Sequence, residues 1–402
     1  MNRLKYLLAI DRNAAQPTLM AIFLIGFAQI LVWGGSFFLL AVLARPIMAE
    51  TGWSRQWVYG ALSLGIFISG LLLPYGGKYI ANKGGRNVLA YSGITTAVGL
   101  IIIGFTSSLS VFMLAWCVLG IAMAMGLYDA LFATLGDTYR ANAKKAIVTV
   151  TLISGFCTSI VWPLLAYGVS HIGWRNTCFV WAVVLIITIF PIYWFCLPKV
   201  SKPRLPKNTV TKQSITIDKT IYTLMSYIFM LTAVIMTAVT VQLIDLLQEE
   251  GFKLAAAIAI SALIGPTQVA ARILDIIIHI SHPIWSLCLS VILVFLGMAL
   301  ICIVPKYAAL AVIFYSAGNG LRSIVRGTLP LAILKAEEYA LVMGKIARPS
   351  LIAQSLTPFL FGILLEQMGA KAVFSTLAVI AAITVLLCLS LTVQLKKKGF
   401  LN

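Results

Sequence analysis

Hydrophobic positions dominate this chain, and they fall into long runs separated by short polar connections. About 20 apolar residues are enough for a helix to cross a bilayer, so we predict twelve membrane-spanning helices. Most of the runs carry no stripe of polar residues at helical spacing, as expected where lipid surrounds a bundle. The predicted spans, numbered 1 to 12 below, are 18–44, 56–81, 88–106, 109–136, 146–170, 178–197, 220–247, 254–278, 283–303, 307–332, 348–365 and 372–394.

Residues 198–219 form the one long polar run, and they lie at the midpoint of the chain. The run separates residues 1–197 from residues 220–402, and each part holds six predicted spans. We therefore predict an all-α polytopic membrane protein of two pseudo-symmetric six-helix bundles, joined by a basic cytoplasmic linker. The basic residues of the linker are Lys199, Lys202, Arg204, Lys207, Lys212 and Lys219.

Composition supports the membrane class and excludes a water-soluble fold. The chain is 61% hydrophobic and 10% charged, with a mean hydropathy of +1.00. A soluble domain carries about 25% charged residues, which it needs to keep a polar surface. Twelve spans and short loops account for nearly all of the 402 residues, so no extramembrane domain is predicted.

The net charge of +18 is distributed unevenly across the predicted membrane. With the N-terminus inside, about twenty Lys and Arg fall on one side and about six on the other, as the positive-inside rule describes. Both termini and the linker are therefore predicted to be cytoplasmic. A cationic segment beside anionic lipid needs no nucleic acid to explain it.

The cysteines and histidines indicate no metal site and no enzyme. All seven cysteines lie in or beside apolar spans without CxxC spacing, which favours small packing residues over disulfides or zinc ligands. The sequence contains no zinc spacing, phosphate-binding loop, nucleophile elbow or paired catalytic carboxylates. We predict no cofactor and no catalytic residue.

The two parts of the chain resemble each other weakly. Gly126-Leu127-Tyr128-Asp129 in span 4 leads to Thr134-Leu135, and Gly320-Leu321-Arg322-Ser323 in span 10 leads to Thr328-Leu329 at the same offsets. Pro163-Leu164-Leu165 in span 5 with a later Gly173 also corresponds to Pro358-Phe359-Leu360 in span 11 with a later Gly369. These matches suggest two related six-helix units of the same orientation.

With these repeats, the whole chain resembles the major facilitator superfamily. Residues 77–86 between spans 2 and 3 resemble its loop signature through Gly77, Gly85 and Arg86, whereas Asn82 stands where the family usually places an aspartate. The charge lock attributed to that acid is therefore in doubt here. Two external motifs, Gly52-Trp53-Ser54-Arg55 and Gly173-Trp174-Arg175, resemble those of bacterial relatives of monocarboxylate and oxalate/formate carriers. Tryptophans that anchor the outer interface beside a turn glycine are the alternative interpretation.

The resemblance implies two bundles that rock about a central cavity lined by spans 1, 4, 7 and 10. Buried ionisable residues should mark a site at the repeat interface, because a charge facing lipid is costly. Asp129 and Arg322 are expected at similar depth in opposite bundles, where they would form either a gate or a fixed structural pair. We predict Asp129 as the proton-coupling residue.

The arginines of spans 8 and 10 suggest an anionic substrate. A buried arginine cannot lose its proton, and its guanidinium matches a carboxylate or a phosphate. We favour Arg322 over Arg326, which could instead extend to the cytoplasmic interface. Arg272 is either a carboxylate contact or half of a structural pair with Asp275.

Polar and aromatic side chains on these spans complete the candidate substrate site, although they could equally be hydrogen bonds that hold the helices together. Asp245 in span 7 is expected to be a solvated cap. The candidate lining residues are Tyr128, Gln29, Trp33, Ser36, Asn319 and Gln268.

The leading hypothesis is a secondary active carrier of a small organic anion, proton-coupled and monomeric, in a bacterial cytoplasmic membrane. The first alternative is an efflux antiporter for drugs, metabolites or metal chelates, although span 5 lacks the glycine-rich run typical of many antiporters. The alternative of another class is a non-transporting membrane receptor or assembly partner. Uncompensated arginines speak against that last alternative, because a receptor has no use for them.

Overall fold

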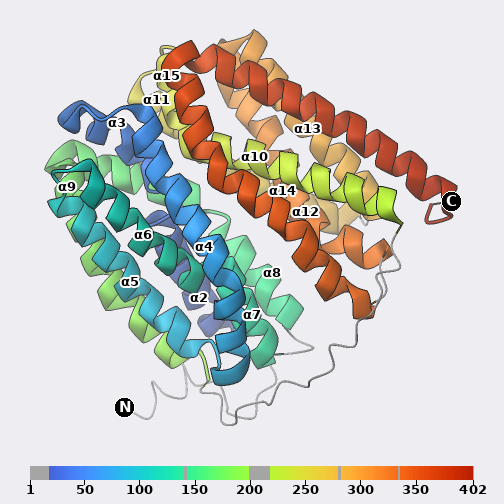
Figure 1. Cartoon of the computed structure of the whole chain (residues 1–402), viewed down its shortest axis with the longest axis horizontal. Coiled ribbons are helices and arrows are strands. Elements are labelled where there is room, and N and C mark those ends of the chain that lie inside the picture. Colours follow the sequence, from blue (N-terminus) through green and yellow to red (C-terminus); the bar gives the residue numbers. More distant parts are fainter. Residues whose placement is uncertain (1–17, 140–142, 199–217, 279–281, 334–335, 402) are drawn as a thin grey trace. The chain divides into compact units, whose positions relative to one another are not determined.

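The computed structural model describes residues 18–139, 143–198, 218–278, 282–333 and 336–401. These residues form helices joined by short connections, with no strand among them (Figure 1). The chain divides into two compact units, unit 1 (residues 1–208) and unit 2 (residues 209–402). The division falls within the polar run 198–219, most of which lies outside the described residues.

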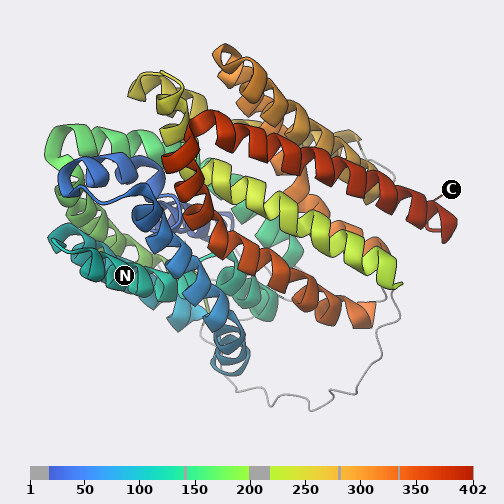
Figure 2. The same cartoon turned by 45° about the horizontal axis from the view of Figure 1, so that its top comes forward.

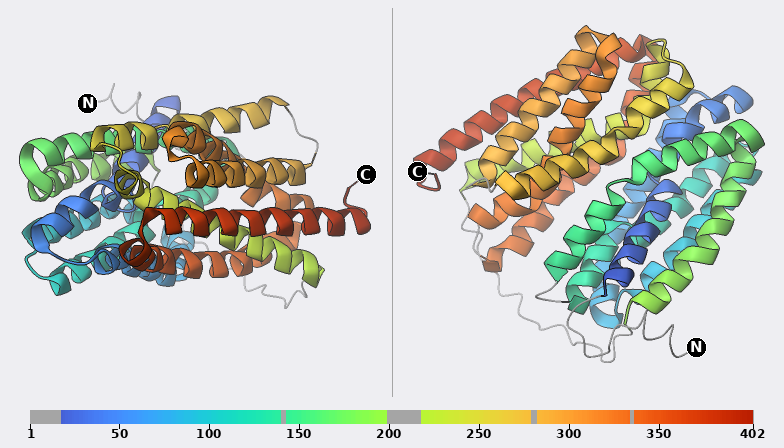
Figure 3. Two further views of the ribbon diagram at one scale, coloured as in Figure 1. Left: turned by 90° about the horizontal axis from the view of Figure 1, so that it is seen from above. Right: turned by 180° about the vertical axis from the view of Figure 1, so that it is seen from behind.

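Unit 1 places three of its helices on the near side of Figure 1, with α6 between α4 and α5, while α2 and α8 lie behind them and face the viewer in the rear view of Figure 3. Its helices are α2 (Leu19–Gly34), α3 (Leu40–Thr51), α4 (Arg55–Lys83), α5 (Arg86–Phe105), α6 (Leu109–Gly126), α7 (Tyr128–Tyr139), α8 (Ala143–Ser154) and α9 (Cys157–Cys196).

Unit 2 is built around the long helices at its start and its end, which run side by side in Figures 1 and 2. Its helices are α10 (Lys219–Glu249), α11 (Leu254–Ala262), α12 (Ile264–Ile278), α13 (Pro283–Ile303), α14 (Ala308–Ile333) and α15 (Ala336–Lys397), with a short 3-10 helix, η2 (Pro305–Tyr307), before α14.

The described helices account for the twelve predicted spans. Nine of them are long and apolar enough to cross a membrane, and the shorter apolar helix α2 continues into α3 to form span 1. Two of the nine are hairpins, because α9 and α15 each contain one non-helical residue, Gly173 and Gly369, with φ of 77° and 76°. Glycine adopts this left-handed region without a steric penalty. The prediction of a twelve-span all-α fold is confirmed.

Close packing at glycines holds the helices of each unit together at several points. A Cβ on Gly120 would lie 2.6 Å from the backbone oxygen of Gly65, so α4 and α6 approach backbone to backbone. Gly70, Gly76 and Gly77 of α4 are different, because a Cβ on any of them would meet no atom within 4 Å. These three glycines face open space.

The start of unit 2 is fixed by a helix cap. Asp218 precedes α10, and its carboxylate accepts hydrogen bonds from the backbone N–H groups of Thr220 and Ile221. The other carboxylate oxygen pairs with Nζ of Lys398 at 3.0 Å. The pair joins the beginning of α10 to the end of α15.

Candidate functional site

Span 4 is a broken helix. Helix α6 ends at Gly126, Leu127 is extended with ψ of −177°, and α7 begins at Tyr128. A break within a membrane span leaves backbone groups that need other partners. Interrupted spans of this kind often surround binding sites in transporters, because the helix ends expose polar groups and partial charges.

Gln29 of α2 supplies the missing partner. Its Nε2 donates hydrogen bonds to the carbonyl oxygen of Gly126 and to the hydroxyl of Tyr193, both at 2.7 Å. Its Oε1 accepts a hydrogen bond from Nε1 of Trp33 at 3.2 Å. Gln29 is fully buried, so these bonds occupy the amide. Its side chain holds the break in span 4, which favours the alternative that it joins helices.

An aromatic cluster surrounds the start of α7. The ring of Trp33 lies 4.9 Å from that of Tyr128 and 5.5 Å from that of Phe37, and Tyr128 stacks on Phe132 at 5.0 Å. The hydroxyl of Tyr128 is 2.7 Å from that of Ser154. Both Trp33 and Tyr128 are half-buried and so present part of their rings to a neighbouring molecule.

The other candidate residue of span 1, Ser36, is occupied within its own helix region. Its hydroxyl is fully buried and donates to the carbonyl oxygen of Val32 at 2.6 Å. This contact gives Ser36 a structural role in the turn between α2 and α3.

Asp129 lies in the first turn of α7, directly after the break. Its side chain is exposed, so the expectation that a buried charge marks span 4 is wrong. The position has a favourable field, because the N-terminus of a helix carries partial positive charge that stabilises a carboxylate.

Polar residues follow one face of α14 in unit 2. Tyr315, Asn319, Arg322 and Arg326 recur at spacings of four, three and four residues, which places them on one side of the helix. Arg322 is buried, with 7% of its surface exposed. Its Nε donates a hydrogen bond to Oδ1 of Asn319 at 2.8 Å. Among the described residues, the guanidinium of Arg322 forms no ion pair.

Two other arginines lie close enough to act electrostatically on Arg322. These are Arg326, half-buried one turn further along α14, and Arg272 of α12. Arg272 donates from Nε to the carbonyl oxygen of Gly320 and from Nη2 to Oε1 of Gln268, each at 3.4 Å. Unit 2 therefore gathers three cations on α12 and α14.

The expected structural pair between Arg272 and Asp275 does not form. Asp275 instead accepts a hydrogen bond from the hydroxyl of Ser286 at 2.7 Å. Arg272 bonds to α14, whereas Asp275 bonds to α13, so these two neighbouring side chains of α12 turn toward different helices. This is a correction to the sequence prediction.

Asp245 also differs from its prediction. It was expected to be a solvated cap, yet only 2% of its surface is exposed. Helix α10 continues for another turn beyond it, to Glu249, and the fully buried Gln242 lies one turn before it. The burial places Asp245 inside unit 2 rather than at its surface.

The signature loop forms the predicted tight turn. Helix α4 ends at Lys83, Gly84 takes a left-handed φ of 80°, and Gly85 is the N-cap of α5, which begins at Arg86. A Cβ on Gly85 would overlap the Thr134 side chain, and the guanidinium of Arg86 lies 4.2 Å from the Trp194 ring. Asn82 is the second-last residue of α4. Its side chain lies outside the described part of the structure, as does any contact that could replace the charge lock.

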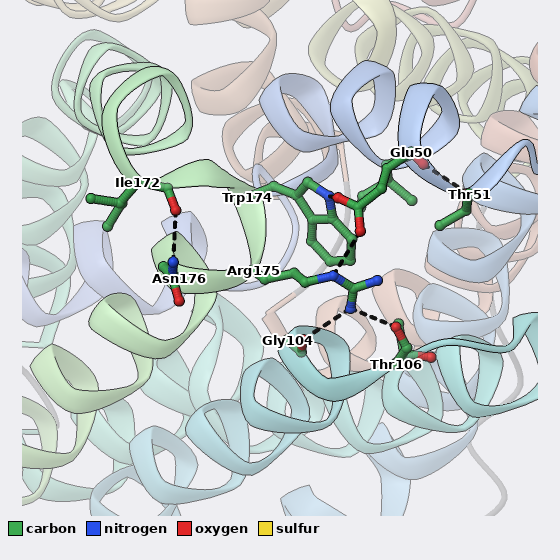
Figure 4. A network of polar contacts seen from close by, with 9 residues as sticks. Glu50, Thr51, Gly104, Thr106, Ile172, Trp174, Arg175 and Asn176 are labelled. Atoms are coloured by element: carbon green, nitrogen blue, oxygen red, sulfur yellow. Dashed lines mark hydrogen bonds and ion pairs between the residues drawn. The ribbon is translucent and has the colours of Figure 1, made fainter.

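The motif Gly173-Trp174-Arg175 is bonded to Glu50, close before the other external motif, in a network of unit 1 shown in Figure 4. Arg175 forms an ion pair with Glu50 at 2.9 Å, and Nε1 of Trp174 donates to the same carboxylate at 2.6 Å. Arg175 also donates from Nη1 to the carbonyl oxygens of Gly104 and Thr106, at 3.0 and 2.5 Å. The guanidinium thereby satisfies carbonyl groups at the C-terminal end of α5.

This outer network is structural, since its polar groups are satisfied by one another. The hydrogen bond from Arg175 lowers the pKa of Glu50, so that carboxylate stays ionised at neutral pH. Glu50 lies two residues before Gly52 and was not among the predicted residues. Its position as the last acid before span 2 was the available signal.

Sequence reasoning also missed Phe37, Phe132 and Tyr193, which complete the polar and aromatic surroundings of Gln29 and Tyr128. In a span that is apolar throughout, the sequence gives no pattern that distinguishes residues lining a binding site from residues facing lipid. Tyr315 could have been found, because it extends the Asn319 and Arg322 stripe by one turn.

Long apolar helices in two units, with an interrupted span in one and an arginine stripe in the other, define a polytopic membrane transporter rather than an enzyme. The sequence model of the major facilitator superfamily matches residues 22–347. The chain belongs to this superfamily, and transporters of this family carry small molecules across a membrane.

Solved structures share the fold at low sequence identity. The nucleoside transporter NupG has a TM-score of 0.71 at 13% identity, over 92% of this chain and 99% of that one. A bacterial homologue of the lysosomal transporter Spinster has 0.69 at 14%, over 92% and 94%. A peptide transporter, POT, in complex with alafosfalin has 0.73 at 12%, over 96% and 95%. No curated protein sequence matches the chain.

Proposed function

We propose that the protein transports a small organic anion, such as a carboxylate, by proton-coupled alternating access. Arg322 is the principal anion-binding residue, with Arg326 and Arg272 adding positive potential. Gln268 and Asn319 orient their guanidinium groups. The carrier acts as a monomer in a bacterial cytoplasmic membrane, with both termini on the cytoplasmic side.

The observation that carries the anion proposal is the burial of Arg322 without an acidic partner among the described residues. Removing a guanidinium from water is costly, and one neutral amide does not compensate a full charge. Two further arginines raise the local positive potential. A bound carboxylate would form charge-assisted hydrogen bonds with Arg322. Its negative charge would offset the desolvation of the guanidinium and its repulsion by the two other arginines.

The proton proposal rests on Asp129. Its carboxylate lies at the start of α7, beside the aromatic cluster and the break that Gln29 holds. Protonation there would remove a negative charge from a helix N-terminus, and the lost interaction is the free energy that a proton could couple to a change of conformation. Asp129 and Arg322 belong to different units, so an ion pair between them stays a prediction.

Two steps test the function. Purified protein is first screened by thermal unfolding in detergent against carboxylates, phosphorylated solutes, zwitterions and neutral solutes, because a ligand of the folded state raises its apparent stability. Solutes that stabilise the protein are then tested for uptake into proteoliposomes with and without a pH gradient. Anionic hits accumulated in response to the pH gradient would support the proposal.

Stabilisation by neutral or cationic solutes alone would contradict the anion assignment. Uptake of an anion that is indifferent to the pH gradient would contradict proton coupling while leaving the substrate class intact. Because binding and coupling are measured separately, the two parts of the proposal can fail independently.

A further inference from the structure

A groove outside the candidate transport site opens on the surface of unit 1. It has a volume of about 430 Å³ and lies between α4 and α5, with α6 as its floor. Tyr75 and Tyr79 of α4 and Tyr91 of α5 form its walls, and their exposed fractions are 71%, 43% and 48%. The three helices lie on the near side of unit 1 in Figure 1.

The floor of the groove is apolar. Ile121, Ala124 and Met125 of α6 line it, together with Leu72 of α4. This composition matches a hydrocarbon chain rather than a polar solute.

Gly76 keeps the groove open. A Cβ built on this residue would meet no atom within 4 Å, although Gly76 itself lines the groove. Gly120 on the facing helix is different, because it is packed against the backbone of Gly65. Gly76 therefore creates space that no other part of the described chain fills.

The depth of the groove determines what can occupy it. All three helices are membrane spans, over Arg55–Gly77, Arg86–Phe105 and Leu109–Gly136. An open hollow beside hydrocarbon does not stay empty, because lining atoms without partners lose dispersion energy. Tyrosine, with its apolar ring and polar tip, is suited to the interfacial end of such a hollow.

The groove ends beside a cation. Nζ of Lys83 lies 5.4 Å from the centre of the Tyr79 ring, and Lys83 is exposed. The sequence holds no acidic residue between Glu50 and Asp129, so α4, α5 and α6 carry none. The potential at this end of the groove therefore favours a negatively charged group.

We propose that this groove binds an anionic phospholipid, with one acyl chain between α4 and α5 and the headgroup phosphate near Lys83. The proposal goes beyond the transport function and does not depend on it. Bound lipid would fill the groove between α4 and α5 and so stabilise unit 1.

Gly76→Leu tests the groove, since the added side chain projects into it. Gly70→Leu is the matched control, because Gly70 lies on the same helix, also faces open space and does not line the groove. Native mass spectrometry of delipidated protein, with added phosphatidylglycerol or phosphatidylcholine, measures retained lipid. We expect phosphatidylglycerol retention to fall at least about fivefold in Gly76→Leu, relative to Gly70→Leu and the unmodified protein.

Lys83→Gln tests the headgroup assignment. We expect the variant to keep lipid in the groove but to lose its preference for phosphatidylglycerol over phosphatidylcholine. Equal retention by both glycine variants would overturn the site. A preference that is unchanged in Lys83→Gln would overturn the headgroup assignment.

Tyr79→Trp gives a second measurement, which leaves Gly76 in place and so does not block the groove with a larger side chain. Acyl-brominated phosphatidylglycerol in nanodiscs should quench the new tryptophan more strongly than brominated phosphatidylcholine, after subtraction of the quenching in the unmodified protein. Equal quenching by the two lipids would contradict selective binding. Displacement of the brominated lipid by a transported solute would assign the groove to substrate instead.

Discussion

Span 4 of unit 1 and span 10 of unit 2 contain the same Gly-Leu pair at equivalent positions of the repeat, yet only span 4 is broken there. The chain leaves the helix at Leu127 in span 4, whereas Leu321 lies inside the continuous helix α14. In both spans the glycine carbonyl accepts a side-chain hydrogen bond, from Gln29 at 2.7 Å and from Arg272 at 3.4 Å. Local sequence alone therefore does not decide whether the helix breaks.

The difference teaches that the partner helix selects the backbone conformation. In unit 1 a short hydrogen bond from the buried amide of Gln29 stabilises the released carbonyl of Gly126. In unit 2 the bond from Arg272 to Gly320 is long, the same carbonyl accepts a 2.6 Å bond from Ser323 of its own helix, and the helix continues without a break. In the broken span, Asp129 lies at the N-terminus of the helix that follows the break. In the continuous span, Arg322 and Arg326 lie along one face of α14. We propose that the two units supply the proton site and the anion site respectively.

The largest expected effect is that of Arg322→Ala on the continuous span. Loss of charge-assisted hydrogen bonds, each contributing about 1.5–3 kcal/mol, should weaken anion binding about 10- to 100-fold. Ser323→Ala is the matched control, because its hydroxyl bonds only to the carbonyl of Gly320 within its own helix. Affinities from thermal-shift titration measure the change. Equal affinities in both variants would exclude Arg322 as the anion site.

On the broken span, Asp129→Asn should remove pH-driven accumulation while preserving substrate exchange. A gradient of about one pH unit supplies about 1.4 kcal/mol per coupled proton, or roughly tenfold accumulation. Proteoliposome uptake with an imposed gradient measures this, and Asp129→Glu should restore it in part. Accumulation that survives in Asp129→Asn would assign the proton elsewhere.

Gln29→Leu should destabilise the folded protein at the break in span 4. The substitution leaves the Gly126 carbonyl and the Tyr193 hydroxyl without their buried partner, at a cost of about 2–3 kcal/mol. Gln242→Leu in unit 2 is the control, since Gln242 is equally buried but makes one bond, of 3.3 Å, to Pro358 and leaves Oε1 unsatisfied. Thermal unfolding in detergent should show the larger loss for Gln29→Leu. Equal losses would mean that the break does not depend on Gln29.

The two glycines of the shared pair should also respond differently to alanine. A Cβ on Gly320 would lie 2.6 Å from the backbone oxygen of Gln268, whereas on Gly126 it would meet the side chain of Ser92. A backbone atom cannot rotate away from the new methyl group, whereas a side chain can. Gly320→Ala should therefore lower the free energy of unfolding by about 1–3 kcal/mol, and Gly126→Ala should lower it by less. Unfolding temperatures of the two variants in one detergent decide the order, and the reverse order would refute it.

The smallest effect concerns the outer network. Glu50 has a pKa below its ordinary value of 4.5, so its contribution to stability is present above that value and is lost as pH falls through the lowered pKa. Glu50→Gln should cost less than about 1 kcal/mol at pH 7, because both partners are partly exposed. Unfolding temperatures measured from about pH 7 down to a pH below the lowered pKa should converge for the variant and the unmodified protein. A constant difference would mean that ionisation is not involved.

The sequence by itself determined the class and the twelve spans, while the relation between the two parts of the chain stays a prediction. Hydrophobicity is sufficient for this, because in a bilayer every backbone group must be bonded within its own helix, and length and composition then identify each span. It also identified Arg322 and Arg326 as neighbours on one face, since helical spacing fixes that relation within a single span.

The tertiary structure alone decided which polar residues are occupied by other helices. Gln29 and Tyr193 are 164 residues apart, and Arg175 reaches Glu50 across 125 residues. The sequence offered a pair with Asp275 as one of two alternatives for Arg272, and that pair does not form; it also predicted a solvated Asp245, which is buried. Side chains at helical spacing turn toward whichever neighbouring helix offers a partner, and that neighbour is set by packing rather than by local sequence.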